Sequence, residues 1–139
     1  MAPLKYDSIM IYVKYRHKES PLHGVGLFSD QDIEKGELLL TASPLLDVDI
    51  TQEEFDSLSQ SERDEVRWWG YFDQPSQIWH VDFDVSRFIN HSYDATVTQA
   101  EHHGEACLVA ARDVKAGEEL TQNYLDIETP EDLARRGIA

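Results

Sequence analysis

The chain of 139 residues contains a single cysteine, Cys107, and no apolar run long enough to span a bilayer. One cysteine excludes an internal disulfide and a cysteine-rich zinc site, so we expect Cys107 to be a small buried residue on a strand. The first residues lack the charged start, the apolar stretch and the cleavage site of a secretion signal. These absences predict a soluble intracellular protein, cytoplasmic or nuclear, with no membrane partner.

Positive charge is also scarce. Lys and Arg number 12 against 27 Asp and Glu, which gives a formal net charge of −15 at pH 7. A surface this acidic repels phosphates and argues against direct binding of nucleic acid. It attracts a basic partner and speeds the encounter at low salt, although acidic balance is also common in ordinary soluble proteins.

Metal ligands at a recognisable spacing are missing as well. His102 and His103 are adjacent, and adjacent side chains point to opposite sides of an extended chain. With Gly104 next, we expect a solvated loop there and no metal site. Residues 90–92 (Asn-His-Ser) match an N-glycosylation acceptor, but nothing in the sequence directs the chain to a secretory route.

The length suits one domain with one core, and several segments have strand character. Runs rich in β-branched and aromatic residues predict strands at 9–15, 78–83 and 106–111. Shorter strands are expected at 27–29, at 38–46 with a break near Pro44, and at 119–124, with a loop at 17–22. A tight turn is predicted at 34–37. The pattern favours a mostly-β protein.

Helix signals are confined to two places. Thr51 and Glu54 form a capping box, and a second helix start at 61–64 predicts two short helices within 51–69. Val66 and Trp69 would form the apolar face of the second helix. Near the end, Thr129 is expected to cap a short helix with Pro130 at its first position, and Gly137 to end it.

The segment 24–26 (Gly-Val-Gly) predicts a tight turn, for which glycine permits positive φ. A hairpin turn is the plain interpretation of this pattern alone. A dinucleotide-binding fingerprint would need a third glycine at the start of a helix in a βαβ unit. Residues 28–33 show no such helix, so a Rossmann fold is excluded.

Three motifs follow one another along the chain. The opening motif consists of residues 24–28 (Gly-Val-Gly-Leu-Phe) and 32–38 (Asp-Ile-Glu-Lys-Gly-Glu-Leu). The central motif occupies 87–92 (Arg-Phe-Ile-Asn-His-Ser). The closing motif at 111–121 contains Gly-Glu-Glu-Leu-Thr and is followed by Tyr124. Each motif is weak alone. Their order and separation resemble the SET domain of protein-lysine methyltransferases over most of the chain.

This resemblance implies a single SET domain over residues 1–139, with a helical insert at about 51–69. The implied fold is a β-clip with a pseudoknot, a short helical insert and a short C-terminal helix. In the pseudoknot the last motif threads under a loop of the preceding segment, a rare exception to unthreaded chains. The threading would bring Asn90 and His91 close to Tyr124.

The resemblance also implies a function, the transfer of a methyl group from S-adenosyl-L-methionine to a lysine of a basic protein or peptide, with a histone tail as one candidate. Tyr124 matches the catalytic tyrosine, whose hydroxyl would orient the attack rather than act as a base at its usual pKa near 10. A narrow aromatic channel would lower the pKa of the lysine by desolvation. The positions matching cofactor contacts are Gly24, Val25, Gly26, Leu27, Phe28, Arg87, Asn90, His91 and Tyr124.

Four aromatic residues, Trp68, Trp69, Tyr71 and Trp79, are candidates for the wall of that channel. Packing in the core is the preferred interpretation for each of them.

Departures from the family pattern leave a second hypothesis open. Residues 93–96 (Tyr-Asp-Ala-Thr) stand where the family often has Cys-x-Pro-Asn, and Asn123 stands where Asp is frequent. The C-terminal cysteine segment that binds zinc in many relatives is absent, so the last helix, or the second subunit of a homodimer, would cover the channel. The alternative is a catalytically inactive SET-like module that binds a protein partner.

Overall fold

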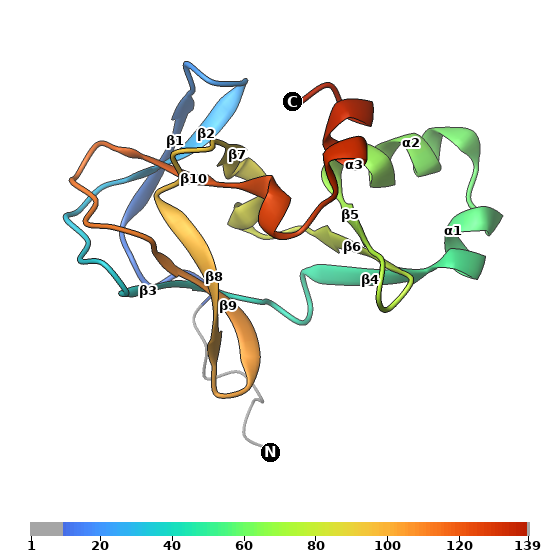
Figure 1. Cartoon of the computed structure of the whole chain (residues 1–139), viewed down its shortest axis with the longest axis horizontal. Coiled ribbons are helices and arrows are strands. Elements are labelled where there is room, and N and C mark those ends of the chain that lie inside the picture. Colours follow the sequence, from blue (N-terminus) through green and yellow to red (C-terminus); the bar gives the residue numbers. More distant parts are fainter. Residues whose placement is uncertain (1–9, 139) are drawn as a thin grey trace. The chain divides into compact units, whose positions relative to one another are not determined.

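A computed structural model describes residues 10–138, which form two compact units (Figure 1). The first unit comprises residues 10–43 and 88–123, and the second comprises 44–87 and 124–138. The first unit is built on a β-sheet, and the second combines a smaller sheet with short helices, so the described residues are mostly β, as the sequence predicts. Within residues 10–138 no helix is long and apolar enough to cross a membrane.

The first unit contains a seven-stranded sheet. Its strands are β1 (Tyr15–Glu19), β2 (Val25–Ser29), β3 (Leu38–Thr41), β7 (Asn90–His91), β8 (Val97–His102), β9 (Glu105–Ala110) and β10 (Glu119–Gln122). Their order is β1-β2-β10-β8-β9-β3, with β7 also paired to β10. β10 runs antiparallel to β2 but parallel to β7 and β8, so the closing motif lies beside both the opening and the central motif. This parallel pairing is what the expected pseudoknot requires.

The core of the first unit draws on most of these strands. Its most deeply buried side chains are Leu27, Leu39, Ile89, Val97, Val114 and Leu120. Burial of a side chain of this size contributes about 1.5–3 kcal/mol relative to its exposure. Cys107 is 5% exposed on β9, which confirms the prediction of a buried strand position.

The second unit joins a three-stranded sheet to three helices. The sheet has the order β4-β6-β5, from β4 (Asp47–Thr51), β5 (Tyr71–Asp73) and β6 (Ile78–Asp82). The helices are α1 (Gln52–Ser57), α2 (Gln60–Trp69) and α3 (Pro130–Arg135), and short 3-10 turns lie at η1 (Val85–Phe88) and η2 (Tyr124–Asp126). Phe55 of α1 stacks on Trp79 of β6, with ring centroids 4.6 Å apart. Val66 of α2 and Leu133 of α3 are buried.

The helix starts follow the capping rules. Thr51 caps α1 and Glu54 closes the capping box, as predicted. The second helix starts earlier than predicted, because Ser59 is its cap and Glu62 closes a second box. Thr129 and Pro130 open α3 as expected.

At the end of α3 the cap is Arg136 rather than Gly137. Gly137 follows the cap with φ of +73°. The prediction was therefore one residue late at this end, and the glycine supplies the left-handed turn after the helix.

The N-terminal strand lies later than predicted. Ile9 falls outside the described residues, and 10–14 make only an isolated bridge, from Ile11 to Leu40. β1 instead occupies 15–19, where a loop was expected, because it pairs along its whole length with β2. Such pairing overrides the low strand propensity of a charged segment.

The strands β4, β5, β7 and β8 were not predicted, and two interpretations of side chains were wrong. His102 and His103 do not point apart: their rings meet at 4.2 Å, because φ of +51° at His103 turns the chain between β8 and β9. The turn is exposed, as expected. Trp68 and Trp69 are 45% and 40% exposed, so core packing does not describe them.

Candidate cofactor and catalytic site

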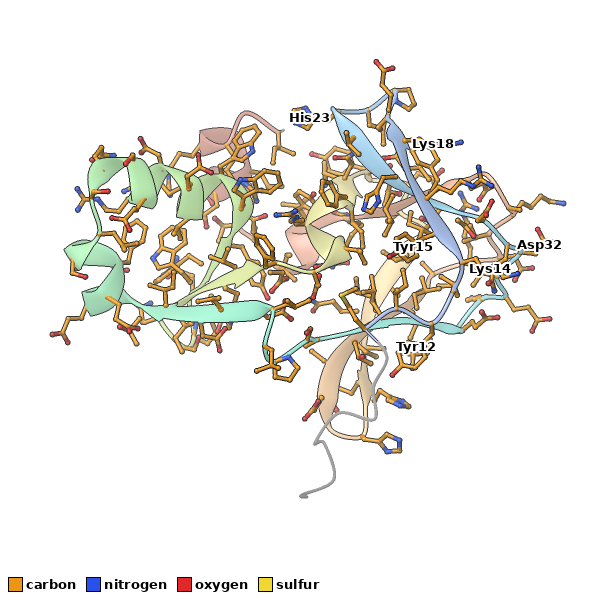
Figure 2. All side chains as sticks on the ribbon, turned by 180° about the vertical axis from the view of Figure 1, so that it is seen from behind. Tyr12, Lys14, Tyr15, Lys18, His23 and Asp32 are labelled. Carbon is orange, nitrogen blue, oxygen red and sulfur yellow. The ribbon has the colours of Figure 1, made fainter. Side chains whose placement is uncertain are left out.

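The connection between β1 and β2 spans 20–24, so the tight turn predicted at 24–26 lies earlier: only Gly24 belongs to it, and Val25 and Gly26 already pair within β2. Gly24 has φ of +46°, which favours glycine, and its carbonyl oxygen accepts a hydrogen bond from the Ser20 amide at 2.7 Å. Figure 2 labels His23, the residue before Gly24, at the end of this hairpin. Gly24 and Val25 are exposed, whereas residues 26–28 are buried. The turn therefore presents a short exposed stretch of backbone on a fixed strand.

A carboxylate fixes this turn to the central motif. Glu119 of β10 accepts hydrogen bonds from Ser20 Oγ at 2.8 and 2.9 Å and from Asn90 Nδ2 at 2.9 Å. Asn90 Nδ2 also donates to the His23 carbonyl oxygen at 2.9 Å. We call Ser20, Asn90 and Glu119 the Glu119 clamp. It joins the hairpin, β7 and β10, which are far apart in sequence.

Gly26 is required by this clamp for a steric reason. A Cβ at this position would lie 2.5 Å from Glu119 Oε2 and 3.0 Å from Ser20 Cβ. The two glycines thus have different roles: the first allows a left-handed turn, and the second admits the carboxylate.

Asn90 and His91 are positioned by parallel pairing with Thr121 and Gln122 of β10. Asn90 is 9% exposed, and its amide group donates within the clamp, which leaves Oδ1 as its acceptor for a ligand. Desolvation lowers the pKa of His91, and a hydrogen bond with the Gln122 backbone opposes the shift in part. The ring of His91 is therefore held toward its neutral form.

Arg87 belongs to the second unit and lies among aromatic rings. Its guanidinium is 4.4 Å from the ring centroid of Phe83 and 5.6 Å from that of Trp69. Both rings are partly exposed, Phe83 at 62%. Such cation–π contacts contribute about 0.5–1 kcal/mol at exposed sites and fix the guanidinium plane.

Tyr124 opens the turn η2 of the second unit, two residues along the chain from the end of β10. The guanidinium of Arg136 lies 5.6 Å from its ring centroid. Arg136 itself is fixed by an ion pair with Glu128 at 2.5 Å and by donation to the Trp68 carbonyl oxygen at 2.9 Å. Burial raises the pKa of Glu128, and Arg136 opposes that shift. The tyrosine ring thus lies beside a half-buried cation that is held by two other contacts.

The structure joins some of the predicted site residues and leaves others in separate units. Gly26 and Asn90 meet through Glu119 in the first unit, while Arg87 and Tyr124 belong to the second. Ser20 and Glu119 were not predicted as site residues. The sequence signal for Glu119 is its position directly before Leu120, an apolar residue that is buried in the structure. The partners of Glu119 depend on the pairing of β10 with other strands, which the sequence does not specify.

Comparison with known families identifies the class of protein. The SET domain family matches residues 24–125, which is most of the chain. The chain therefore belongs to the SET domain family, whose members are protein-lysine methyltransferases. A search of curated proteins found no match.

Solved structures agree with this assignment. A chain of apo ctPRC2 with mutations in Ezh2 is 27% identical, with a TM-score of 0.66, over 88% of this chain and 16% of that chain. A chain of the humanized Chaetomium thermophilum Polycomb Repressive Complex 2 bound to the inhibitor GSK126 is also 27% identical, with a TM-score of 0.63 and the same coverages. The present chain thus spans 16% of the length of these Polycomb chains.

A Plasmodium falciparum candidate histone methyltransferase is more similar in size. It is 21% identical, with a TM-score of 0.59, over 82% of this chain and 95% of that chain. At this identity the match supports the fold alone, and the fold is that of a SET domain.

Proposed function

We propose that this chain transfers a methyl group from S-adenosyl-L-methionine to a lysine side chain of a basic protein or peptide. The observation that carries the proposal is the Glu119 clamp, which holds the exposed Gly24 turn against Asn90. A turn fixed in this way presents backbone groups to a ligand without reorganisation on binding.

The residues of the first unit fit the methionine part of the cofactor. An added Cβ at Gly24 would meet nothing within 4 Å, so a ligand can approach that backbone closely. Asn90 Oδ1 is an acceptor suited to the cofactor's amino group. A neutral His91 avoids placing a second positive charge near a sulfonium, and the direction of its pKa shift favours that form.

When bound, S-adenosyl-L-methionine would supply a methyl group on a sulfonium; the neutral lysine amine would attack that carbon in line, S-adenosylhomocysteine would leave as the thioether, and the methylated ammonium would then lose a proton to solvent. Tyr124 would orient that amine through its hydroxyl, and Arg136 holds the tyrosine ring in place. Positioning of this kind supplies a large share of the rate in such displacements. Arg87, whose guanidinium is fixed by Phe83 and Trp69, would contact the cofactor from the central motif.

The substrate class follows from charge. With 27 acidic and 12 basic residues the chain attracts basic segments, and a lysine that enters an apolar channel loses its proton more readily. A histone tail meets both conditions and would place the activity in the nucleus. A second subunit of a homodimer, or α3, would cover the channel.

Calorimetric titration with S-adenosyl-L-methionine tests the proposal. We expect saturable binding to the wild type, and much weaker binding to Glu119→Gln, which disrupts the clamp. Glu118→Gln is the matched control, because that neighbouring side chain is outside the clamp and pairs with Arg112. If the folded protein binds no cofactor at several temperatures, the methyltransferase proposal is wrong and the catalytically inactive protein-binding module is the remaining hypothesis. The 67% exposure of Tyr93, an aromatic side chain available to a partner, favours that alternative.

A further inference from the structure

Strand β1 lies at the border of the seven-stranded sheet, with β2 on one side and no strand on the other among residues 10–138. The Asp30 amide donates to the Lys14 carbonyl oxygen at 2.8 Å, and the Ser20 amide donates to the Gly24 carbonyl oxygen at 2.7 Å. Hydrogen-bonded pairs alternate with non-bonded pairs in an antiparallel ladder, so the even-numbered residues of 14–20 bond to β2. The N–H and C=O groups of the odd-numbered residues 15, 17 and 19 therefore point away from the sheet.

The even-numbered side chains along this border are cationic. Lys14, Arg16 and Lys18 are three of the 12 Lys and Arg residues of the chain, and alternation places them on one face of the strand. Figure 2 labels both lysines along this segment. Arg16 pairs with Asp30 at 3.2 Å, whereas neither lysine makes an ion pair within the described part of the chain. The face therefore keeps positive charge for a ligand.

The odd-numbered side chains begin with a row of aromatic rings on the opposite face. The rings of Tyr15 and His17 meet edge to face with centroids 5.7 Å apart, and His17 meets Phe88 in the same way at 4.7 Å. A strand added to β1 would place every second side chain beside these rings and the others beside the cations.

The charge pattern selects the kind of strand that fits this border. Like charges directly opposite each other on paired strands are destabilising, so the cations disfavour a basic strand and also the β1 of a second copy. Opposite charges stabilise such a pair, which favours a strand with Asp or Glu at alternate positions. The chain as a whole is acidic, but the Debye length of about 8 Å at physiological ionic strength limits what an exposed strand experiences to the charges near it.

We propose that β1 binds an extended acidic segment of a partner protein, which adds to the sheet as a further antiparallel strand. Acidic side chains of that segment lie opposite Lys14, Arg16 and Lys18, and apolar ones lie opposite Tyr15 and His17. Main-chain hydrogen bonds to residues 15, 17 and 19 hold it in place. The proposal goes beyond methyl transfer and uses none of the residues assigned to the cofactor or to the lysine.

Nuclear magnetic resonance on the full chain, with a capped Glu-Val-Glu-Val-Glu peptide as the probe, tests the proposal. We expect the amide signals of residues 15, 17 and 19 to shift to saturation and their hydrogen exchange to slow, because these amides gain acceptors. A Glu-Glu-Glu-Val-Val peptide has the same composition without the alternation and should bind more weakly. A Lys-Val-Lys-Val-Lys peptide should leave these signals unchanged.

Reversal of charge tests the contribution of the lysines. Lys14→Glu combined with Lys18→Glu should weaken binding of the alternating acidic peptide about tenfold or more, because two attractive cross-strand pairs become repulsive. Lys35→Glu combined with Lys115→Glu is the matched control. It makes the same change in net charge at two exposed lysines outside β1, so binding should change less than about twofold.

A backbone variant distinguishes an added strand from simple attraction of charge. His17→Pro removes one outward N–H, and proline is tolerated on a border strand whose N–H faces solvent. Compared with His17→Ala, which removes the ring but keeps the donor, it should weaken binding about two- to tenfold, the loss of one hydrogen bond. Should His17→Pro fail to fold, the exchange rates of the three amides in the wild type carry the same information.

Three results would overturn the proposal. The first is no shift of the amides at 15, 17 and 19 with the alternating acidic peptide. The second is an equal response to tripolyphosphate, which would reduce the feature to a general anion-binding surface. The third is a shift of the same amides with protein concentration in the absence of peptide, which would assign the border to a second copy of the chain.

Discussion

Glu119 illustrates how a single carboxylate can organise a site built from distant segments. It accepts from Ser20, 99 positions away in sequence, and from Asn90, 29 positions away. Because the carboxylate occupies the space beside Gly26, the glycine, the asparagine and the acid form one unit. We expect variants of any one of them to affect the other two.

The first prediction compares two adjacent acids. Glu119→Gln should lower the free energy of unfolding by about 1.5–3 kcal/mol, because hydrogen bonds to a charged, partly buried acceptor are lost. Glu118→Gln should change it by less than about 1 kcal/mol, because its pair with Arg112 is solvated. Urea denaturation of the two variants measures both values. Equal stability would show that the clamp contributes nothing.

A second residue-scale prediction concerns Tyr124. Tyr124→Phe keeps the ring against Arg136 but removes the hydroxyl. We expect kcat to fall about 100-fold or more, since a group positioned for the transition state is lost, while cofactor affinity changes less than about threefold. Single-turnover kinetics and calorimetry separate the two quantities. A loss of affinity with unchanged kcat would assign Tyr124 to cofactor binding instead.

At the residue scale, the order of the motifs predicts Gly24, Asn90 and Tyr124 as site residues, and their roles stay predictions. Glu119 belongs to the closing motif, but its contact with the space beside Gly26 is made across the sheet, and no local sequence pattern encodes such a contact.

Among the elements, the residues that follow η2 and α3 are joined by one ion pair, between the buried Glu128 and the half-buried Arg136. Arg136 is 16% and Glu128 2% exposed, and the same guanidinium contacts the Trp68 carbonyl oxygen and the Tyr124 ring. Removal of one member of a buried pair leaves an uncompensated charge and costs more than the pair contributes. The C-terminal helix therefore supports the position of Tyr124 as well as its own docking on α2.

The third prediction uses the two consecutive arginines of this segment. Arg136→Met should destabilise the second unit by about 3–5 kcal/mol, because Glu128 stays buried without its partner. Arg135→Met should cost less than about 1 kcal/mol, because its pair with Asp132 is exposed on the arginine side. Thermal unfolding followed by tryptophan fluorescence measures both. Similar melting temperatures would contradict a structural role for Arg136.

Element prediction succeeded where local signals dominate and failed where pairing decides. The capping box at Thr51 and the helix after Thr129 depend on local signals, and both predictions are confirmed. The box of Ser59 and Glu62 was missed, because the start of the second helix was predicted two residues later. β1 and β8 are polar and largely exposed, so they exist because a partner strand lies alongside. That information is not contained in their own residues.

For the molecule as a whole, the excess of acidic residues brings carboxylates close together on the sheet of the second unit, which disfavours their ionised forms. Asp82 of β6 lies opposite Asp47 of β4 and near Asp84. Burial, followed by repulsion from Asp84, raises the pKa of Asp82 to about 6 from 3.8. The folded state therefore binds this proton more tightly than the unfolded chain.

The fourth prediction follows from that pKa. The contribution of Asp82 to stability is fully present below a pH of about 4 and is lost as the pH rises through about 6. Asp82→Asn should therefore be more stable than the wild type at pH 7, by up to about 3 kcal/mol, with the gain vanishing near pH 4. Asp94→Asn, an exposed aspartate, serves as the control. A gain that does not depend on pH would contradict the assignment.

The central claim concerns the whole chain, and methyl transfer itself tests it most directly. The purified protein is incubated with S-adenosyl-L-methionine and either core histones or basic lysine-containing peptides, and the products are mapped by mass spectrometry. The account predicts methylated lysine, formed together with S-adenosylhomocysteine and lost in Tyr124→Phe. A folded protein that binds the cofactor but methylates no lysine in any basic substrate would contradict it.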